Sequence, residues 1–182
     1  VELVIKTNHF VNQEEKQNEL TNWIRDQGMT NVKVLWGAMN HSEIIKLYQQ
    51  SHVFVLPSKG EGWGLPLIEA AAIGLPIITT MYSGHTEFLQ HITSSVIPVE
   101  FDMAPIGCQE YQTFYPAPDK DWGQWAHPRI PSIRQALQYS RQHYQVLQQQ
   151  AWSNSEIIRR NFSWDQSVDC ALKTLQKQGL LK

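Results

Sequence analysis

The stretch Val53–Glu69, VFVLPSKGEGWGLPLIE, decides the fold class of this chain. Its first part, Val53–Leu56, is short and uniformly apolar, which predicts a buried strand. Pro66 suits the first turn of a helix, so Pro66–Ile73 predicts a helix that ends at Gly74. A buried strand, a glycine-rich loop and a helix N-terminus, in that order, are typical of a parallel α/β sheet.

The chain on either side of this stretch repeats the same alternation. Further strands are predicted at Val1–Lys6, Val32–Trp36, Ile77–Thr79 and Ser95–Val99, and helices at Glu14–Gln27, after Asn40, and at Thr86–Gln90. Asn40 is predicted to cap the second of these helices, with Glu43 three residues later as in a capping box. Because parallel strands need right-handed helical crossovers, the pattern predicts a doubly wound, Rossmann-like parallel sheet with helices on both faces.

The second half of the chain changes character. Residues Glu100–Pro131 are rich in proline, glycine and aromatic side chains and lack a clear period, so they predict an irregular, aromatic-rich but packed insertion. Three C-terminal helices are expected after it, at Ser132–Gln150, Trp152–Arg160 and Trp164–Gln176. With 182 residues, the whole chain is expected to form a single domain.

Composition excludes several classes of protein. Fifteen basic residues against 17 acidic ones give a net charge of -2, which argues against a nucleic-acid binder held by phosphate contacts. Two cysteines, Cys108 and Cys170, are too few for a disulfide scaffold or a multi-cysteine zinc site. No apolar run is long enough to span a bilayer and no signal peptide is visible, so a cytoplasmic location is expected.

The opening residues suggest that this chain is part of a longer protein. Val1 is not a start methionine and opens directly into a predicted core strand. We therefore expect an upstream portion, with a processed small protein as the alternative.

The loop between the strand and the helix carries Gly60, Gly62 and Gly64. Glycines allow a close backbone approach to a ligand, and the first amides of a helix lack internal partners and favour an anion such as phosphate. The spacing GxGxG, after the third predicted strand, is not the dinucleotide-binding fingerprint. The sequence therefore predicts an anion site without a dinucleotide motif.

Two carboxylates, Glu61 and Glu69, bracket this loop. Glu69 falls one turn into the helix, where a carboxylate can accept two hydrogen bonds from a ribose diol. The alternative is structural: Glu69 is stabilised by the helix dipole, and Glu61 is a solvated loop residue. Spacing alone does not separate these interpretations.

The residues 57–80, PSKGEGWGLPLIEAAAIGLPIITT, followed by SGHTEFL, resemble the donor-binding half of retaining glycosyltransferases of group 1 (family 4), which have the GT-B fold of two facing Rossmann-like domains. The Glu-x7-Glu motif of that family matches at Glu61 and Glu69, with GWGLP where GFGLP is common. The family's second turn is usually Gly-Gly-x-x-Glu, and Ser83 replaces its first glycine. LYQQSHVFVLPS resembles the family's tyrosine-bearing helix and following strand. The resemblance covers residues 1–99 well and the last helices loosely.

The resemblance implies roles for the loop residues. Glu69 would bind the ribose of a nucleotide sugar, and Glu61 would lie beside the donor sugar as the catalytic residue. Backbone N–H groups at Gly62, Trp63, Gly64 and Leu65 would hold the sugar and the diphosphate.

Three more residues are candidates with weaker support. NVKVLWGAMN resembles the strand and loop that help to hold the nucleotide base, which makes Gly37 a donor-binding candidate. His85, in the second turn, is either a donor contact or polar filler. Family members carry an Arg and a Lys upstream of the first predicted strand; Lys59 could replace them or be merely solvated.

The resemblance also implies partners and an activity. The substrate would be a nucleoside-diphosphate sugar, and no cofactor or metal is expected; the net charge already argues against nucleic acid as a partner. The missing N-terminal acceptor domain would be the partner, and peripheral membrane association could occur through that half. We expect retaining transfer of a hexosyl group, with this domain inactive alone. The alternatives are a non-catalytic nucleotide-sugar-binding or scaffold module and a related epimerase or phosphorylase; base, sugar and acceptor stay open.

Overall fold

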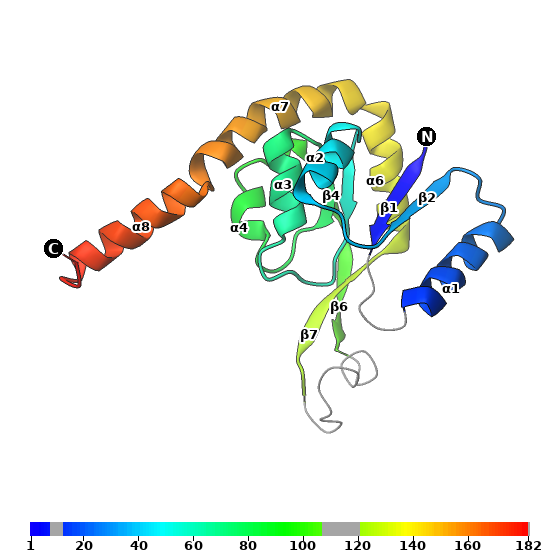
Figure 1. The fold of residues 1–182 in the computed structure, drawn as a ribbon, viewed down its shortest axis with the longest axis horizontal. Helices are drawn as coiled ribbons and strands as arrows, with labels where there is room; N and C mark the ends of the chain where they lie inside the picture. The colour runs from blue at the N-terminus through cyan, green and yellow to red at the C-terminus, as the bar shows by residue number, and fades with distance from the viewer. Residues whose placement is uncertain (8–12, 107–120, 182) are drawn as a thin grey trace. The chain divides into compact units, whose positions relative to one another are not determined.

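The computed structural model describes residues 1–7, 13–106 and 121–181, and the chain divides into two compact units, residues 1–46 and 47–182 (Figure 1). Whether residues 1–182 act as one domain stays a prediction.

The first unit is built around two parallel strands. β1 (Leu3–Thr7) pairs with β2 (Val32–Trp36), and α1 (Gln13–Asp26) lies between them in the chain. Residues 8–12, between β1 and α1, lie outside the described part. Ile24 of α1 is buried. A parallel pair with a helical crossover agrees with the predicted α/β class.

The capping box predicted at Asn40 is confirmed. The Asn40 Oδ1 atom accepts a hydrogen bond from the Glu43 N–H at 3.0 Å, and the Glu43 carboxylate accepts one from the Asn40 N–H at 2.7 Å. These reciprocal bonds satisfy two amides that a helix start would leave unpaired. They begin α2 (His41–Gln49), which spans the division between the units.

The second unit contains a three-stranded parallel sheet in the order β3-β4-β5, formed by β3 (Phe54–Leu56), β4 (Ile77–Thr80) and β5 (Val96–Val99). α3 (Leu65–Ile73) connects β3 to β4, and α4 (Thr86–Leu89) with a short 3-10 turn, Thr93–Ser95, connects β4 to β5. All four residues of the central strand β4 are buried, as expected for a strand covered on both faces.

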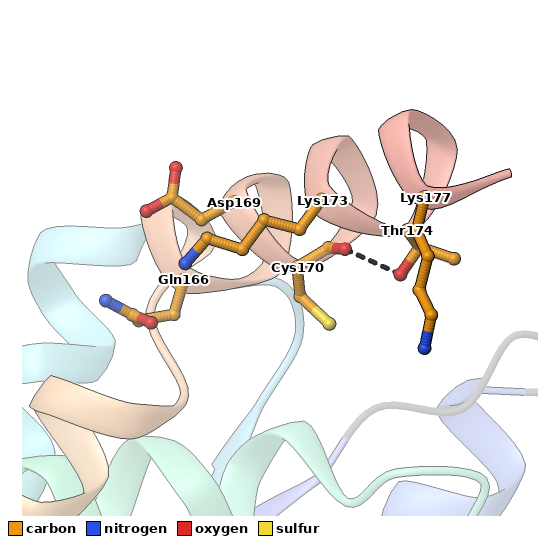
Figure 2. A pocket seen from close by; sticks show the side chains of 6 residues that line it. All are labelled: Gln166, Asp169, Cys170, Lys173, Thr174 and Lys177. Carbon is orange, nitrogen blue, oxygen red and sulfur yellow. Dashed lines mark hydrogen bonds between the residues drawn. The ribbon is translucent and has the colours of Figure 1, made fainter. Parts of the chain in front are cut away.

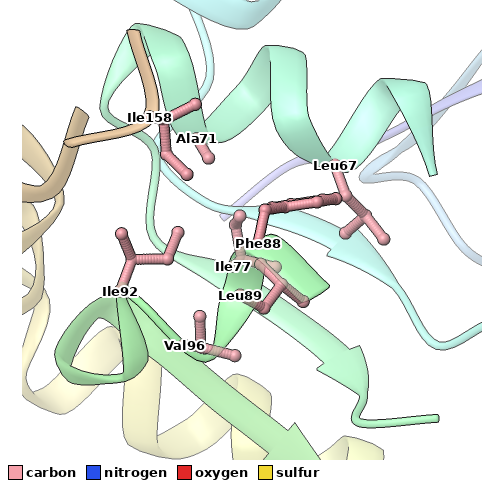
Figure 3. Packing of buried hydrophobic residues seen from close by; sticks show 8 residues of the cluster. All are labelled: Leu67, Ala71, Ile77, Phe88, Leu89, Ile92, Val96 and Ile158. Atoms are coloured by element: carbon pink, nitrogen blue, oxygen red, sulfur yellow. The ribbon is translucent and has the colours of Figure 1, made fainter. Parts of the chain in front are cut away.

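Two apolar clusters hold this sheet between its helices. The larger joins α3, β4, α4, β5 and α7 (Tyr144–Asn161) through Leu67, Ala71, Ile77, Phe88, Leu89, Ile92, Val96 and Ile158 (Figure 3). The smaller lies on the other side of β4 and consists of Ile78, Ile97, Val99, Ala136 and Leu147. Because successive side chains of a strand point to opposite faces, Ile77 and Ile78 enter different clusters.

The predicted irregular insertion is partly wrong. Its two ends form an antiparallel ribbon of β6 (Phe101–Pro105) and β7 (Gln124–Pro128), with Phe101 opposite Pro128. Cys108 and the other residues from 107 to 120 lie outside the described part of the chain. The ribbon was missed because strand pairing depends on register between distant segments, which local periodicity does not show.

The first two C-terminal helices are placed differently from the prediction, and the third is confirmed. α6 spans Ile130–Gln142, with His143 as its C-cap, and α7 then runs without interruption to Asn161. α8 (Trp164–Lys177) begins at the predicted residue and ends one residue later than predicted. α7 continues because Leu147, Ala151, Ser155 and Ile158 form one buried stripe along it. None of the described residues of α8 is buried.

Candidate functional site

The glycine-rich loop lies at the carboxyl ends of two adjacent strands, β3 and β4. The Thr79 hydroxyl donates to the Leu56 carbonyl oxygen at 2.7 Å, and the Thr80 hydroxyl donates to the Ser58 carbonyl oxygen at 2.5 Å. These bonds tie the end of β4 to the end of β3 and to the loop after it. In open α/β sheets this edge is where ligands bind.

The second glycine-rich turn packs directly on the loop. The Gly84 N–H donates to the Glu61 carbonyl oxygen at 3.1 Å. A Cβ atom added at Gly84 would lie 1.9 Å from the Gly62 carbonyl oxygen, far inside van der Waals contact. Only glycine therefore permits this approach of the two backbones.

Ser83 holds the turn in an unusual conformation. Among the described residues it is the only non-glycine with a positive φ, 72°. Its hydroxyl donates to the Glu61 carbonyl oxygen at 3.0 Å and lies 2.8 Å from the Glu61 N–H, which donates to it. Side-chain bonds to the loop offset the cost of a left-handed serine where the resembled family has glycine.

The first turn of α3 offers fewer free amides than the sequence suggested. Gly64, with φ 78°, precedes the helix, and its carbonyl oxygen accepts from the N–H groups of Leu67 at 2.9 Å and Ile68 at 3.2 Å. Pro66 has no N–H group. Leu65 is thus the one first-turn amide of α3 whose N–H has no acceptor among the described residues.

The remaining free amides belong to the loop. Within the described part of the chain, no group accepts a hydrogen bond from the N–H groups of Gly62, Trp63 or Gly64. Together with Leu65 they make four consecutive N–H donors that lack an acceptor in residues 1–7, 13–106 and 121–181, and Leu65 is 61% exposed. Consecutive free amides of this kind are suited to an anion.

The side chain of Trp63 turns toward an aromatic cluster. Its ring centroid lies 5.6 Å from that of Phe88 and 6.3 Å from that of Phe162, and His91 contacts Phe162 at 5.6 Å. These contacts anchor the loop to Phe88 in the buried core and to Phe162, the C-cap residue of α7.

His85 lies beneath the loop and is fully buried. Its Nε2 atom is 2.5 Å from the Thr80 carbonyl oxygen, which can only accept, so Nε2 carries the proton. Its Nδ1 atom has no partner among the described residues. A Cβ atom added at Gly64 would meet the His85 Cβ at 3.0 Å, so this side chain supports the loop; a donor contact by His85 stays a prediction.

Glu69 is held by a residue that sequence reasoning did not single out. The Tyr48 hydroxyl donates to the Glu69 Oε2 atom at 3.0 Å. Burial first, and then the charge of Glu69, raise the pKa of the Tyr48 phenol above its ordinary value, so the hydroxyl keeps its proton. The stretch LYQQSHVFVLPS contains this tyrosine, but nothing in its local pattern points to Glu69.

The other predicted residues lie in different surroundings. Glu61 is partly buried, and among the described residues its carboxylate has no hydrogen-bond or ion-pair partner. Lys59 is engaged by the ring of Trp125, with its Nζ atom 4.0 Å from the centroid. Gly37 belongs to the first unit, where its carbonyl oxygen accepts from Lys6 Nζ at 2.6 Å; its role stays a prediction.

Two hollows on the described surface lie away from the loop. One follows a single face of α8 and is lined by Gln166, Asp169, Cys170, Lys173, Thr174 and Lys177 (Figure 2). The other is a groove between the Thr93–Ser95 turn with β5 and the helices α6 and α7. Neither contains a residue of the glycine-rich loop.

The part of the chain that the structure describes offers neither a metal cluster nor a membrane-spanning helix. No group of three histidine, cysteine, aspartate or glutamate residues within the described ranges could hold a metal ion. No helix there is both long and apolar enough to cross a bilayer.

Solved structures share this fold over nearly the whole chain. Sucrose-phosphate synthase from Thermosynechococcus elongatus matches with a TM-score of 0.65 and 17% identity, covering 97% of this chain and 38% of that one. A glycosyltransferase from Rickettsia africae matches with a TM-score of 0.67 and 15% identity, covering 97% of this chain and 39% of that one. The chain thus has an α/β fold of the GT-B glycosyltransferase class.

Sequence comparison then identifies the family. The model for glycosyl transferases group 1 matches residues 2–100. The gpi3 subunit of phosphatidylinositol N-acetylglucosaminyltransferase from Schizosaccharomyces pombe is 35% identical over 69 residues, which is 37% of this chain and 15% of that protein. The serotype-specific mannosyltransferase WbdA of Escherichia coli is 42% identical over 57 residues, 30% of this chain and 7% of that protein. The chain belongs to the group 1 glycosyl transferases and spans a small part of these relatives' length.

Proposed function

We propose that this chain binds a nucleoside-diphosphate sugar at its glycine-rich loop and serves the retaining transfer of a hexosyl group to an acceptor. One observation carries the proposal: the four amides of residues 62–65, which have no acceptor in the described part of the chain, lie between Glu61 and Glu69 at the carboxyl edge of the sheet. Membership of the group 1 family supports it.

The amides act on the diphosphate. As the bond from the sugar to the diphosphate breaks, negative charge grows on the departing oxygen. N–H donors already held in place stabilise that charge without reorganising, and this is the transition-state stabilisation that the loop supplies. Gly84 and Ser83 keep the donors in place by binding the backbone of Glu61.

The two carboxylates act on the sugars. Glu69 accepts hydrogen bonds from the ribose hydroxyls, and Glu61 lies beside the donor sugar, where it accepts hydroxyls or stabilises positive charge at the anomeric centre. Glu61 is partly buried, and its carboxylate has no partner among the residues that the structure describes, which leaves its acceptor sites available for a ligand.

The hexosyl class rests on the relatives. The two described above are named as an N-acetylglucosaminyltransferase and a mannosyltransferase, and both names specify hexose-type sugars. The donor is a substrate, and the proposed chemistry needs neither a cofactor nor a metal. Base and sugar are left open.

The chain provides one side of the site. It covers 38% and 39% of its solved neighbours, and the loop is not part of either hollow described above. We infer that an N-terminal domain supplies the acceptor site and the other wall, together with any peripheral contact to a membrane, in a cytoplasmic enzyme. The chain alone then binds donor with little or no turnover.

Calorimetric titration with UDP-, GDP- and ADP-sugars tests the proposal. At least one should bind, and Glu69→Lys should abolish binding because an ammonium group cannot accept the hydrogen bonds that the ribose hydroxyls donate to the carboxylate. Glu156→Lys, the same charge change at an exposed position of α7, is the matched control and should bind as the parent does. Indifference of the folded parent chain to all three donors would refute the proposal.

A further inference from the structure

The tyrosine of the Tyr48–Glu69 hydrogen bond is buried and packed against a second aromatic ring. Tyr48 is only 8% exposed, and its ring packs edge-on against Phe54 with the centroids 5.7 Å apart. Its hydroxyl lies 3.0 Å from Glu69 Oε2 and 3.4 Å from the Pro66 carbonyl oxygen. Since a phenol has one proton, the shorter contact to the carboxylate takes it.

We propose that Tyr48 is a positioning residue that holds the Glu69 carboxylate in the orientation needed to bind the ribose diol. This inference rests on the function proposed above. A glutamate side chain has three rotatable bonds, and fixing them on binding costs conformational entropy. Tyr48 comes from a different element, α2, and its ring is immobilised by Phe54, so it restrains the carboxylate before the ligand arrives.

The hydrogen bond also leaves room for a diol. A carboxylate has about four lone-pair sites, and Tyr48 occupies one of them, on Oε2. The others can accept from two neighbouring hydroxyls. The ligand class that uses this arrangement is a nucleoside diphosphate with free 2′ and 3′ hydroxyls.

Tyr48→Phe tests this role, because it removes the hydroxyl and keeps the ring against Phe54. The dissociation constants of UDP, GDP and ADP are measured by ligand-observed NMR with the 182-residue chain, beside their 2′,3′-dideoxy counterparts. We expect about five- to tenfold weaker binding of the tightest ribonucleotide and a change of less than about twofold for its dideoxy form. Tyr139→Phe, which removes a hydroxyl from an exposed ring on α6, should change neither.

A second pair of variants separates positioning from general support. In a Glu69→Ala background, Tyr48→Phe should have no further effect on ribonucleotide binding, because the carboxylate that it orients is gone. Equal weakening with both ligand types, persistence of the effect without Glu69, or unchanged binding would each overturn the inference alone. Failure of the folded parent chain to bind any of the nucleotides would overturn the proposed function and this inference together.

Discussion

Gly84→Ala should disrupt the contact between the two glycine-rich turns. The added Cβ atom would lie 1.9 Å from the Gly62 carbonyl oxygen, whereas ordinary contact begins near 3.4 Å, so one backbone must move by about 1.5 Å. That shift breaks the 3.1 Å hydrogen bond from the Gly84 N–H to Glu61, which contributes about 0.5–1.5 kcal/mol. Overpacking adds about 1–3 kcal/mol. We expect the free energy of unfolding to fall by about 2–4 kcal/mol.

Thermal unfolding followed by tryptophan fluorescence measures this loss. At about 2–4 °C per kcal/mol for a chain of this size, the midpoint should fall by roughly 5–15 °C. Gly60→Ala is the matched control in the same loop. Its Cβ atom would meet only Ser83 Oγ at 3.7 Å and Tyr82 Cε1 at 3.9 Å, and its φ is not in the left-handed region. It should melt within about 2 °C of the parent.

A parent-like midpoint for Gly84→Ala would show that the turns do not touch as described. A loss as large for Gly60→Ala would show that the loop resists any added methyl group, which would remove the specific role of the Gly84 contact.

Three further outcomes follow from the second unit. Ser83→Ala removes two hydrogen bonds to the Glu61 backbone and should lower the free energy of unfolding, measured in urea, by about 1–2 kcal/mol. Ser83→Gly should lower it by less, because glycine also relieves the strain of the positive φ. Phe88→Ala, at a fully buried position, should cost about 3–5 kcal/mol in the same assay. The hydrogen bond from Arg129 lowers the pKa of Asp102, so the stabilisation from this pair is present above the unfolded-state pKa and is lost as pH falls through the lower folded-state value. The protection of amides in the β6–β7 ribbon, taken relative to the exchange rate of an unstructured peptide at the same pH, should therefore fall over that acidic range in the parent and not in Asp102→Asn.

Much of the secondary structure could be predicted because its causes are local. The strand Val32–Trp36 has its predicted bounds, and the capping box at Asn40 and the helix stop at Gly74 form as expected. Each depends on residues within one turn of helix or one short apolar run. The position of the glycine-rich loop at the carboxyl end of β3 follows from the same patterns.

The ribbon and the helix boundaries could not be predicted in this way. Pairing of Phe101 with Pro128 joins residues far apart in the chain, and no period within either strand specifies the register. α7 continues through Ala151 because this residue faces the core. A small apolar side chain such as alanine does not indicate from sequence alone whether it is buried.

For this chain, local sequence determined the α/β class, the acidic residues Glu61 and Glu69, and the loop between them, since glycines, prolines and apolar periods act on their own neighbours. The tertiary structure alone decided which groups hold that loop. It placed Tyr48 against Glu69 and Gly84 against Gly62 across about twenty residues of chain. Contacts of that kind arise only when the helices and strands pack, because close packing brings together side chains and backbones that sequence order keeps apart.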